Sequence, residues 1–216
     1  MSSKPNPSQN NPIHSPGNSM TLYARAAANL YGVINFDEFF KILEEYFGKS
    51  SLSKEKVFSF LWAEKEPDPV YCVQDELILH SSISPDEAER YYRQIMRNAD
   101  SRTGKQRRIL PEKEFLLYAD PSFCKETDGT RKMKDFLASE FGLSQEEIQE
   151  IVTEMDFVCR SGSLPTLVGD ALRRRGITCS RRYDSLLLAY GCEIDGQARR
   201  WKDLGYTGRE LLRIMS

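Results

Sequence analysis

Side chains that commonly perform acid–base or nucleophilic chemistry are scarce in this sequence. It holds two histidines, His14 and His80, and neither belongs to a recognisable motif that pairs a nucleophile with its base. Neighbouring carboxylates such as Glu44 and Glu45 fall in a predicted helix, where adjacent side chains point about 100° apart and cannot converge on one substrate. Glycine-rich phosphate loops, dinucleotide fingerprints and H-E-x-x-H motifs are absent from the sequence. The sequence therefore predicts a protein that is not an enzyme and uses no cofactor.

Cysteine usage indicates neither a metal site nor a disulfide framework. The five cysteines are odd in number, scattered and never arranged as C-x-x-C: Cys72, Cys124, Cys159, Cys179 and Cys192. Free thiols of this kind are typical of the reducing cytoplasm, where we expect the protein to act. No apolar run approaches the ~20 residues of a membrane span, and the N-terminus lacks the apolar centre of a signal peptide, so we expect no membrane association.

Two arginine-rich stretches are the candidates for binding nucleic acid or a partner. The first is a polar loop expected over residues 98–111; residues 97–113 carry six basic and two acidic side chains, a net charge of +4. The second brackets the end of a predicted helix. The candidate binding residues are Arg102, Lys105, Arg107, Arg108, Arg173, Arg174, Arg175, Arg181 and Arg182. Each stretch also has a structural explanation: the loop can be a solvated connector, and the triplet 173–175 can interact with a helix dipole.

The formal net charge of −2 gives no overall field that would demand a polyanionic partner. The charge is unevenly distributed, however. Residues 20–80 carry six basic and ten acidic side chains, a net of −4, whereas residues 170–216 carry ten basic and six acidic side chains, a net of +4. These two ends either face each other or serve different partners.

The N-terminal elements follow from apolar spacing and helix-stop signals. Residues 1–19 are rich in Pro, Ser and Asn and are expected to be disordered. A first helix over 21–31 should end at Gly32, followed by a short strand at Val33 and Ile34. Asp37 or Asn35 is expected to cap a second helix, which continues to residue 47.

A third helix is predicted over residues 54–64, with Trp62 among its inward-facing residues. Two β-prone runs, 70–73 and 77–80, flank the polar turn 74–76 and predict a hairpin, in which His80 is expected at the surface or on an edge strand. Helix, strand, helix, helix and hairpin is the order of elements in a winged helix, so a winged-helix-like module is expected over residues 20–84.

The rest of the chain, 85–216, is expected to form an all-helical module. Apolar periodicity predicts helices over 86–98, 113–120, 131–141 and 181–190, with others opening near Ser144, Pro165 and Thr207. Ser144 with Glu147, and Thr207 with Glu210, have the spacing of capping boxes. Trp201 is expected to anchor the last helices in the core. The predicted fold class is thus mainly α: a winged-helix-like N-terminal module of three helices and a small β-hairpin, followed by the helical module.

Two stretches, ANLYGVINFDEFFKIL and YDSLLLAYGCEIDGQARRWKDLGYTGRELL, are similar to parts of poorly characterised bacterial proteins. Those proteins have a winged-helix-like N-terminal domain and a helical ending that often precedes a SEC-C zinc tail. Matching places in the ending are held by Arg199 or Arg200, Trp201, Gly205, Thr207, Glu210 and Leu211.

The chain also departs from that pattern. Asp195 and Gly196 stand where the family shows Asn-Asn, Tyr206 where it shows His, and Gly208 where it shows Pro; no zinc-binding cysteines follow Ser216. The resemblance implies an interaction protein of bacteria or their mobile elements. It assigns no reaction, and without the cysteines no metal-dependent role of the tail is expected.

The leading expectation is a non-catalytic cytoplasmic interaction protein that binds a partner protein, with nucleic acid as a second candidate ligand. A narrower version, which the resemblance suggests, is a mobile-element inhibitor of a host CRISPR-like nuclease system. The alternative is a winged-helix DNA-binding transcriptional regulator. Against it, residues 54–66 carry as many acidic as basic side chains and the turn 74–76 is acidic, and acids oppose contact with phosphates. The oligomeric state is left open by the sequence.

Overall fold

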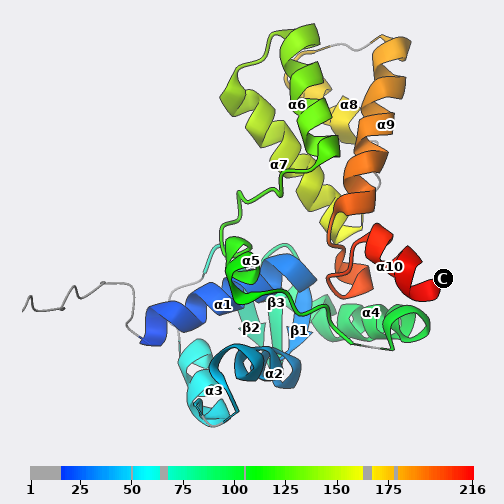
Figure 1. Cartoon of the computed structure of the whole chain (residues 1–216). Coiled ribbons are helices and arrows are strands. Elements are labelled where there is room, and N and C mark those ends of the chain that lie inside the picture. The colour runs from blue at the N-terminus through cyan, green and yellow to red at the C-terminus, as the bar shows by residue number, and fades with distance from the viewer. Residues whose placement is uncertain (1–15, 50, 64–67, 105, 163–166, 178–179) are drawn as a thin grey trace, which may run out of the picture.

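The computed structural model describes residues 16–49, 51–63, 68–104, 106–162, 167–177 and 180–216. These residues are mainly helical, with one small antiparallel sheet, as the sequence predicts (Figure 1). Of the helices described, none has the length and apolar character needed to cross a membrane. The helices are α1 (Pro16–Tyr31), α2 (Phe36–Phe47), α3 (Lys54–Trp62), α4 (Ala88–Thr103), α5 (Glu112–Leu117), α6 (Asp128–Phe141), α7 (Gln145–Ser161), α8 (Leu167–Arg174), α9 (Arg181–Gln197) and α10 (Gly208–Met215), with short 3-10 turns η1 (Pro85–Glu87) and η2 (Trp201–Asp203).

Helix α1 is the buried axis of the N-terminal part. It begins at Pro16, earlier than the predicted start at residue 21, so residues 16–19 are helical rather than disordered; residues 1–15 lie outside the described residues. Its alanines are fully buried and let neighbouring elements approach closely. The helix ends at Gly32, which has a φ of +71° and donates its amide to the carbonyl of Ala28 at 2.8 Å.

The three strands are β1 (Val33–Asn35), β2 (Tyr71–Gln74) and β3 (Leu77–His80), in the order β1-β3-β2. Ile78 of β3 lies opposite Ile34 on one side and Val73 on the other. The predicted order of helix, strand, helix, helix and hairpin is therefore confirmed. The expectation for His80 is wrong: it lies on the central strand and is buried, because β1 pairs with the strand that the hairpin alone would have left at an edge.

Helix α3 differs from its prediction in one side chain. Val57 and Leu61 are buried as expected, but Trp62 is 55% exposed, so its predicted inward position is wrong. Its ring stacks on Phe58 with centroids 5.8 Å apart, at the edge of the core rather than within it. The helix is nine residues long, about two and a half turns, and Trp62 is its last residue, so its side chain lies at the end of the helix.

Helices α6, α7, α8 and α9 form a second group with its own core, which we call the helical lobe (Figure 1). Both predicted capping boxes are present, from Ser144 to Glu147 and from Thr207 to Glu210. Helices α4 and α5 instead pack with the N-terminal helices and the sheet, which together we call the body. The division predicted near residue 84 stays a prediction.

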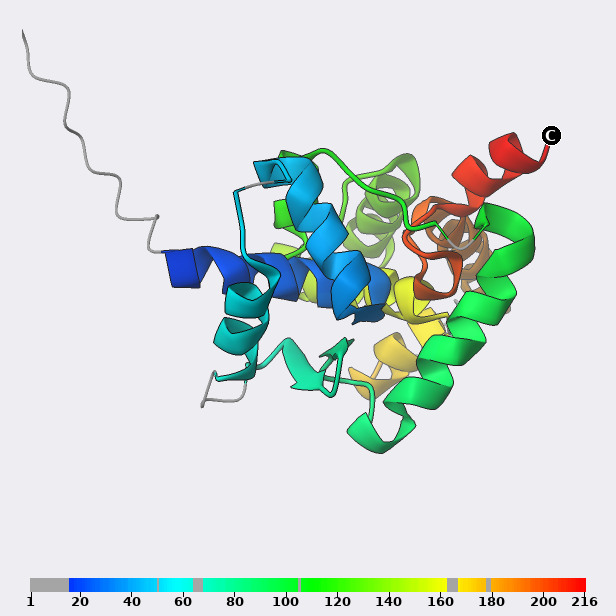
Figure 2. The ribbon, with the colours of Figure 1, turned by 90° about the horizontal axis from the view of Figure 1, so that it is seen from below.

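After the helical lobe the chain returns to the body, where η2 and α10 lie beside α4 (Figures 1 and 2). Trp201 is 2% exposed and anchors this return, as predicted. Its indole N–H donates to the carbonyl of Asn29 at 2.9 Å. The ring lies so close to Gly32 that a Cβ added there would be 2.4 Å from it, so only glycine fits beneath the indole.

Candidate interaction surface

One of the binding residues predicted from the sequence, Arg107, is buried in an ion pair. Its side chain is 4% exposed, and one guanidinium nitrogen lies 2.9 Å from a carboxylate oxygen of Glu38 on α2. The guanidinium also lies over the ring of Tyr31, 5.0 Å from its centroid. A guanidinium paired in this way is not available to an external phosphate, because binding the phosphate would separate Arg107 from Glu38 and leave that carboxylate without its ion-pair partner.

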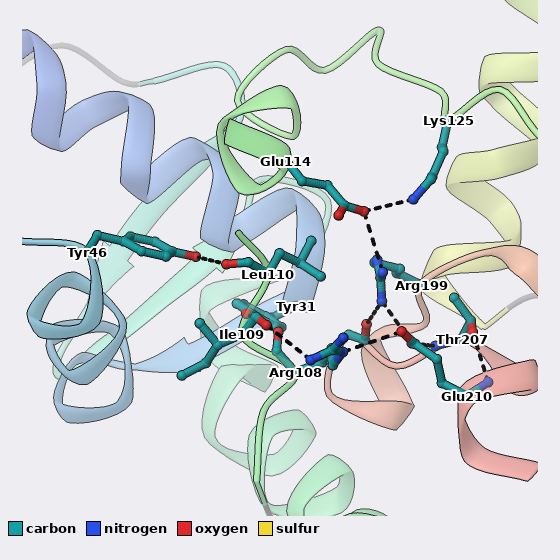
Figure 3. A network of polar contacts seen from close by, with 11 residues as sticks. Tyr31, Tyr46, Arg108, Ile109, Leu110, Glu114, Lys125, Arg199, Thr207 and Glu210 are labelled. Atoms are coloured by element: carbon teal, nitrogen blue, oxygen red, sulfur yellow. Dashed lines mark hydrogen bonds and ion pairs between the residues drawn. The ribbon is translucent and has the colours of Figure 1, made fainter. Parts of the chain in front are cut away.

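Arg108 ties the same loop to the C-terminal segment through both its backbone and its side chain (Figure 3). Its amide donates to the carbonyl of Leu204 at 3.0 Å, and its carbonyl accepts from the hydroxyl of Tyr31 at 2.8 Å. Its guanidinium lies 3.3 Å from Glu210 on α10. A further bond, from the hydroxyl of Tyr46 to the carbonyl of Leu110 at 2.9 Å, fastens the end of the loop. Residues 106–111, which we call the strap, are therefore fixed to the body and to the C-terminal segment by these contacts.

The buried guanidinium of Arg199 shares Glu210 with Arg108 (Figure 3). It lies 2.9 Å from Glu210 and donates to the carbonyl of Gly205 at 3.0 Å, and Glu114 is 3.5 Å away. Burial alone would raise the pKa of Glu210, but the amide of Thr207 and the guanidinium of Arg199 offset it and hold that pKa below its usual value. Arg199 thus joins α5, the η2 segment and α10.

Arg102 does not lie in a loop as predicted, because α4 continues to Thr103. Its guanidinium is 2.5 Å from a carboxylate oxygen of Asp203, whose side chain is fully buried. The other oxygen of Asp203 pairs with Arg200 at 2.6 Å. The structure therefore places the three described basic candidates of this stretch against three different carboxylates; the fourth candidate, Lys105, lies outside the described residues.

The second cluster lies on the helical lobe and is only partly occupied. Arg173 pairs with Asp170 and Arg174 with Glu154, while Arg175 lies 3.2 Å from Glu150. Arg181 and Arg182 open α9, are exposed, and take part in no ion pair among the described residues. The two clusters are in different parts of the molecule, so they do not form one basic surface.

The surface that sequence reasoning missed is formed by the exposed apolar side chains of α10. They are Leu212, Ile214 and Met215, at 72, 55 and 64% exposure. Leu211 on the same helix is buried, and α10 packs against both α4 and α9, so the helix is anchored while its outer residues face solvent. Arg209 and Arg213 lie four residues apart on the side of the helix next to Leu212, are exposed, and have no ion-pair partner in the described part of the chain. The apolar spacing of 211, 212 and 215 is visible in the sequence, but burial of one residue and exposure of the others is not.

The described residues offer little for metal or acid–base chemistry. They include no group of three or more His, Cys, Asp and Glu side chains that could hold a metal ion. The ring of His80 is already engaged in contacts within the protein: the hydroxyl of Ser82 lies 2.8 Å from its Nδ1, and the ring packs against Phe157 and Trp201. Burial, with help from the nearby Arg160, lowers the pKa of His80 to about 4, so the ring is neutral near pH 7.

No protein-family model matches this chain, and neither a curated protein nor a solved structure matches it.

Proposed function

We propose that this protein is a non-catalytic interaction protein that binds an acidic, apolar surface of a partner protein through α10. The observation that carries the proposal is that the exposed Leu212 and Met215 share one side of α10, next to Arg209 and Arg213, which have no ion-pair partner among the described residues. Exposed apolar groups with a charged rim are the usual make-up of a protein-binding patch, since the apolar centre contributes affinity and the rim contributes orientation and association rate.

The occupied state of the basic loop supports a protein partner over nucleic acid. Arg102, Arg107 and Arg108 each neutralise a carboxylate of their own chain, so they add little to an electrostatic surface for phosphates. The four described cysteines are free thiols, which fits the proposed cytoplasmic location. The narrower version, an inhibitor that a mobile element directs at a host nuclease system, rests on the family resemblance alone.

The test is a quantitative comparison of partners recovered by the tagged full chain and by the double variant Leu212→Ser/Met215→Ser. Proteins that bind α10 should be depleted at least tenfold by the double variant. The matched control is Leu188→Ser, which removes a 46% exposed leucine of α9 on the helical lobe and should change nothing. Equal recovery by both variants and the wild type would show that α10 is not the binding surface.

The rim has its own test, Arg209→Glu/Arg213→Glu. Reversing these two charges should weaken capture of the same proteins and invert its dependence on salt, because the acidic partner then meets like charge, which salt screens. Both arginines are exposed and have no ion-pair partner among the residues that the structure describes, so the fold should tolerate the change, which circular dichroism checks. Capture that strengthens after charge reversal would contradict an acidic partner.

A winged-helix DNA-binding regulator remains the second candidate, favoured by the order of α1, β1, α2, α3 and the β2–β3 hairpin. In that reading α3 would meet DNA, yet its exposed Glu55 and the turn residues Asp75 and Glu76 are acidic. Fluorescence anisotropy with a labelled duplex and a labelled single strand separates the two candidates. Binding that persists at physiological salt supports the regulator, and no binding at low salt removes it.

A further inference from the structure

A pocket of about 330 Å³ lies where the body meets the helical lobe. Its volume is at the lower end of the range of roughly 300–1,000 Å³ that small-molecule sites occupy. The body contributes the segment from Ser82 to Glu87 and one face of α4, and the lobe contributes Phe157 and Ser161 from the end of α7. Junctions of this kind are where ligand sites commonly form, because two rigid parts supply opposite walls.

The walls of the pocket are aromatic. Tyr91 of α4 and Phe157 of α7 are both half-buried, so part of each ring is available to a ligand. Trp201 lies behind them, with its centroid 5.7 Å from that of Phe157 in an edge-to-face arrangement. The ring of His80 contacts both Phe157 and Trp201 and holds them in place from the inside. Such surfaces favour a flat, unsaturated ligand.

The polar groups at the rim are neutral or cancel. Arg90 is the basic side chain in the lining, and it pairs with Glu87, which also lines the pocket. Ser84 precedes η1 but its hydroxyl accepts no capping bond from the backbone, and the amide of Gln94 forms no side-chain hydrogen bond with the described residues. These groups offer both donors and acceptors but no net charge to attract an ion.

Two other hollows on the described surface lack this combination. One of about 580 Å³ runs along the exposed polar face of α4, from Glu89 to Asn98, and is lined by side chains of that helix alone. Another of about 290 Å³, between α2 and α3, is lined by Asp37, Lys54, Glu55 and Glu76 around Phe58 and falls below the usual volume. Of these three hollows, the junction pocket alone combines aromatic walls with uncharged polar groups and is lined by both the body and the lobe.

We propose that the junction pocket binds a small, uncharged aromatic heterocycle with hydrogen-bonding groups on its edge, such as a nucleobase or a free nucleoside. The ring inserts between Tyr91 and Phe157, and its edge meets the amide of Gln94 and the hydroxyl of Ser84. Because the walls belong to the body and to the lobe, the bound ligand braces the two against each other. This site is separate from α10 and does not rest on the proposed partner.

The test uses the full chain carrying Trp62→Phe, which leaves Trp201 as the only tryptophan and thus a reporter within the pocket wall. Adenosine is titrated while Trp201 emission and the melting temperature are followed. Both should change saturably, with a Kd of about 1 mM or tighter, and the melting temperature should rise because the ligand binds the folded state. Uridine and free adenine serve as further uncharged probes.

Two substitutions on α4 locate the binding. Gln94→Phe places a large side chain in the pocket and should abolish the response to adenosine. Asn98→Phe, one turn along the same helix and outside the junction pocket, is the matched control and should leave the response unchanged. Both positions are exposed, so the melting temperature without ligand shows directly that each variant is folded.

Three results would overturn the proposal. A flat response to adenosine, uridine and adenine up to their solubility limits would show that the pocket holds no uncharged heterocycle. Equal loss, or equal retention, in the two phenylalanine variants would place any binding elsewhere. Adenosine monophosphate or a short thymidine oligonucleotide binding tenfold more tightly than adenosine would identify an anionic ligand or a nucleic-acid strand instead.

Discussion

The two arginine-rich stretches have similar composition but opposite physical roles. In the first, Arg107 is 4% exposed and holds α2 to the strap that crosses the body. In the second, Arg174 is 57% exposed and pairs with Glu154 on the surface of the lobe. The difference comes from the surroundings: the side chain of Arg107 packs against Glu38 of α2 and the ring of Tyr31, whereas that of Arg174 faces solvent. A basic run in a sequence therefore gives the number of charges without saying whether they face outward.

The largest effect is expected for Arg107→Ala. Removing one partner of a buried pair leaves Glu38 uncompensated, and such losses cost about 3–5 kcal/mol of unfolding free energy. Because Glu38 is itself 21% exposed, we expect about 3 kcal/mol. Urea denaturation measures it, with Arg182→Ala as the control that should stay within about 0.5 kcal/mol. The double variant Arg107→Met/Glu38→Leu should recover part of the loss, because Glu38→Leu also removes the bonds that Glu38 accepts from the amide of Asn35 and the hydroxyl of Tyr92. A single variant as stable as the control would show that the strap is not held by this pair.

The second effect is a loss of unfolding free energy at acidic pH, which we assign to His80. The pKa of His80 is about 4 in the folded protein, well below its ordinary value, because burial disfavours the charged ring. The unfolded chain therefore binds a proton that the folded chain does not, and stability present above about pH 6.5 is lost as the pH falls toward 4. The loss should reach about 2–3 kcal/mol. His80→Gln should flatten the profile of unfolding free energy in this window, and an unchanged slope would show that His80 is not responsible.

A much smaller effect is expected for Arg174→Ala on the lobe. An exposed ion pair is weakened by solvent and salt, so its removal should cost about 0–1 kcal/mol. The same urea measurement detects it, and added salt should reduce the difference from wild type. A loss as large as that of Arg107→Ala would erase the distinction between the two stretches.

The smallest effect is expected where the second stretch is unpaired. Arg181 and Arg182 are the described candidates from the sequence that remain available to a phosphate, so a DNA test belongs here rather than on the strap. Arg181→Ala/Arg182→Ala should leave both stability and anisotropy with a labelled duplex unchanged, if α10 is the functional surface. A marked loss of duplex binding, with a lower salt slope, would instead support the regulator.

Local features of the fold were predictable from short-range chemistry. The capping boxes at Ser144 and Thr207, the end of α1 at Gly32 and the hairpin all depend on a few neighbouring residues and are confirmed. The burial of His80 could not be predicted in this way, because it depends on a partner far along the chain. His80 is buried because β1 pairs with β3, which no pattern within the hairpin reveals.

The candidate site shows the same limit. That Arg102, Arg107 and Arg108 would be paired could not be read from their stretch, because their carboxylates are up to 102 positions away. The apolar face of α10 was visible as leucine and methionine spacing, but its exposure depends on where the body ends. Spacing predicts which side chains share a face and leaves open what covers that face.

The bond from Trp201 to the carbonyl of Asn29 spans 172 positions. During synthesis at about 5–20 residues per second, the end of α1 therefore waits roughly 10–30 s for the indole that covers Gly32. Until then Trp201 does not cover the apolar surface around Val33 and Leu79, although the first helices and the sheet have already left the ribosome. The nascent chain should consequently be most exposed to chaperones and proteases in this interval, and should become resistant only when its final segment closes over its first.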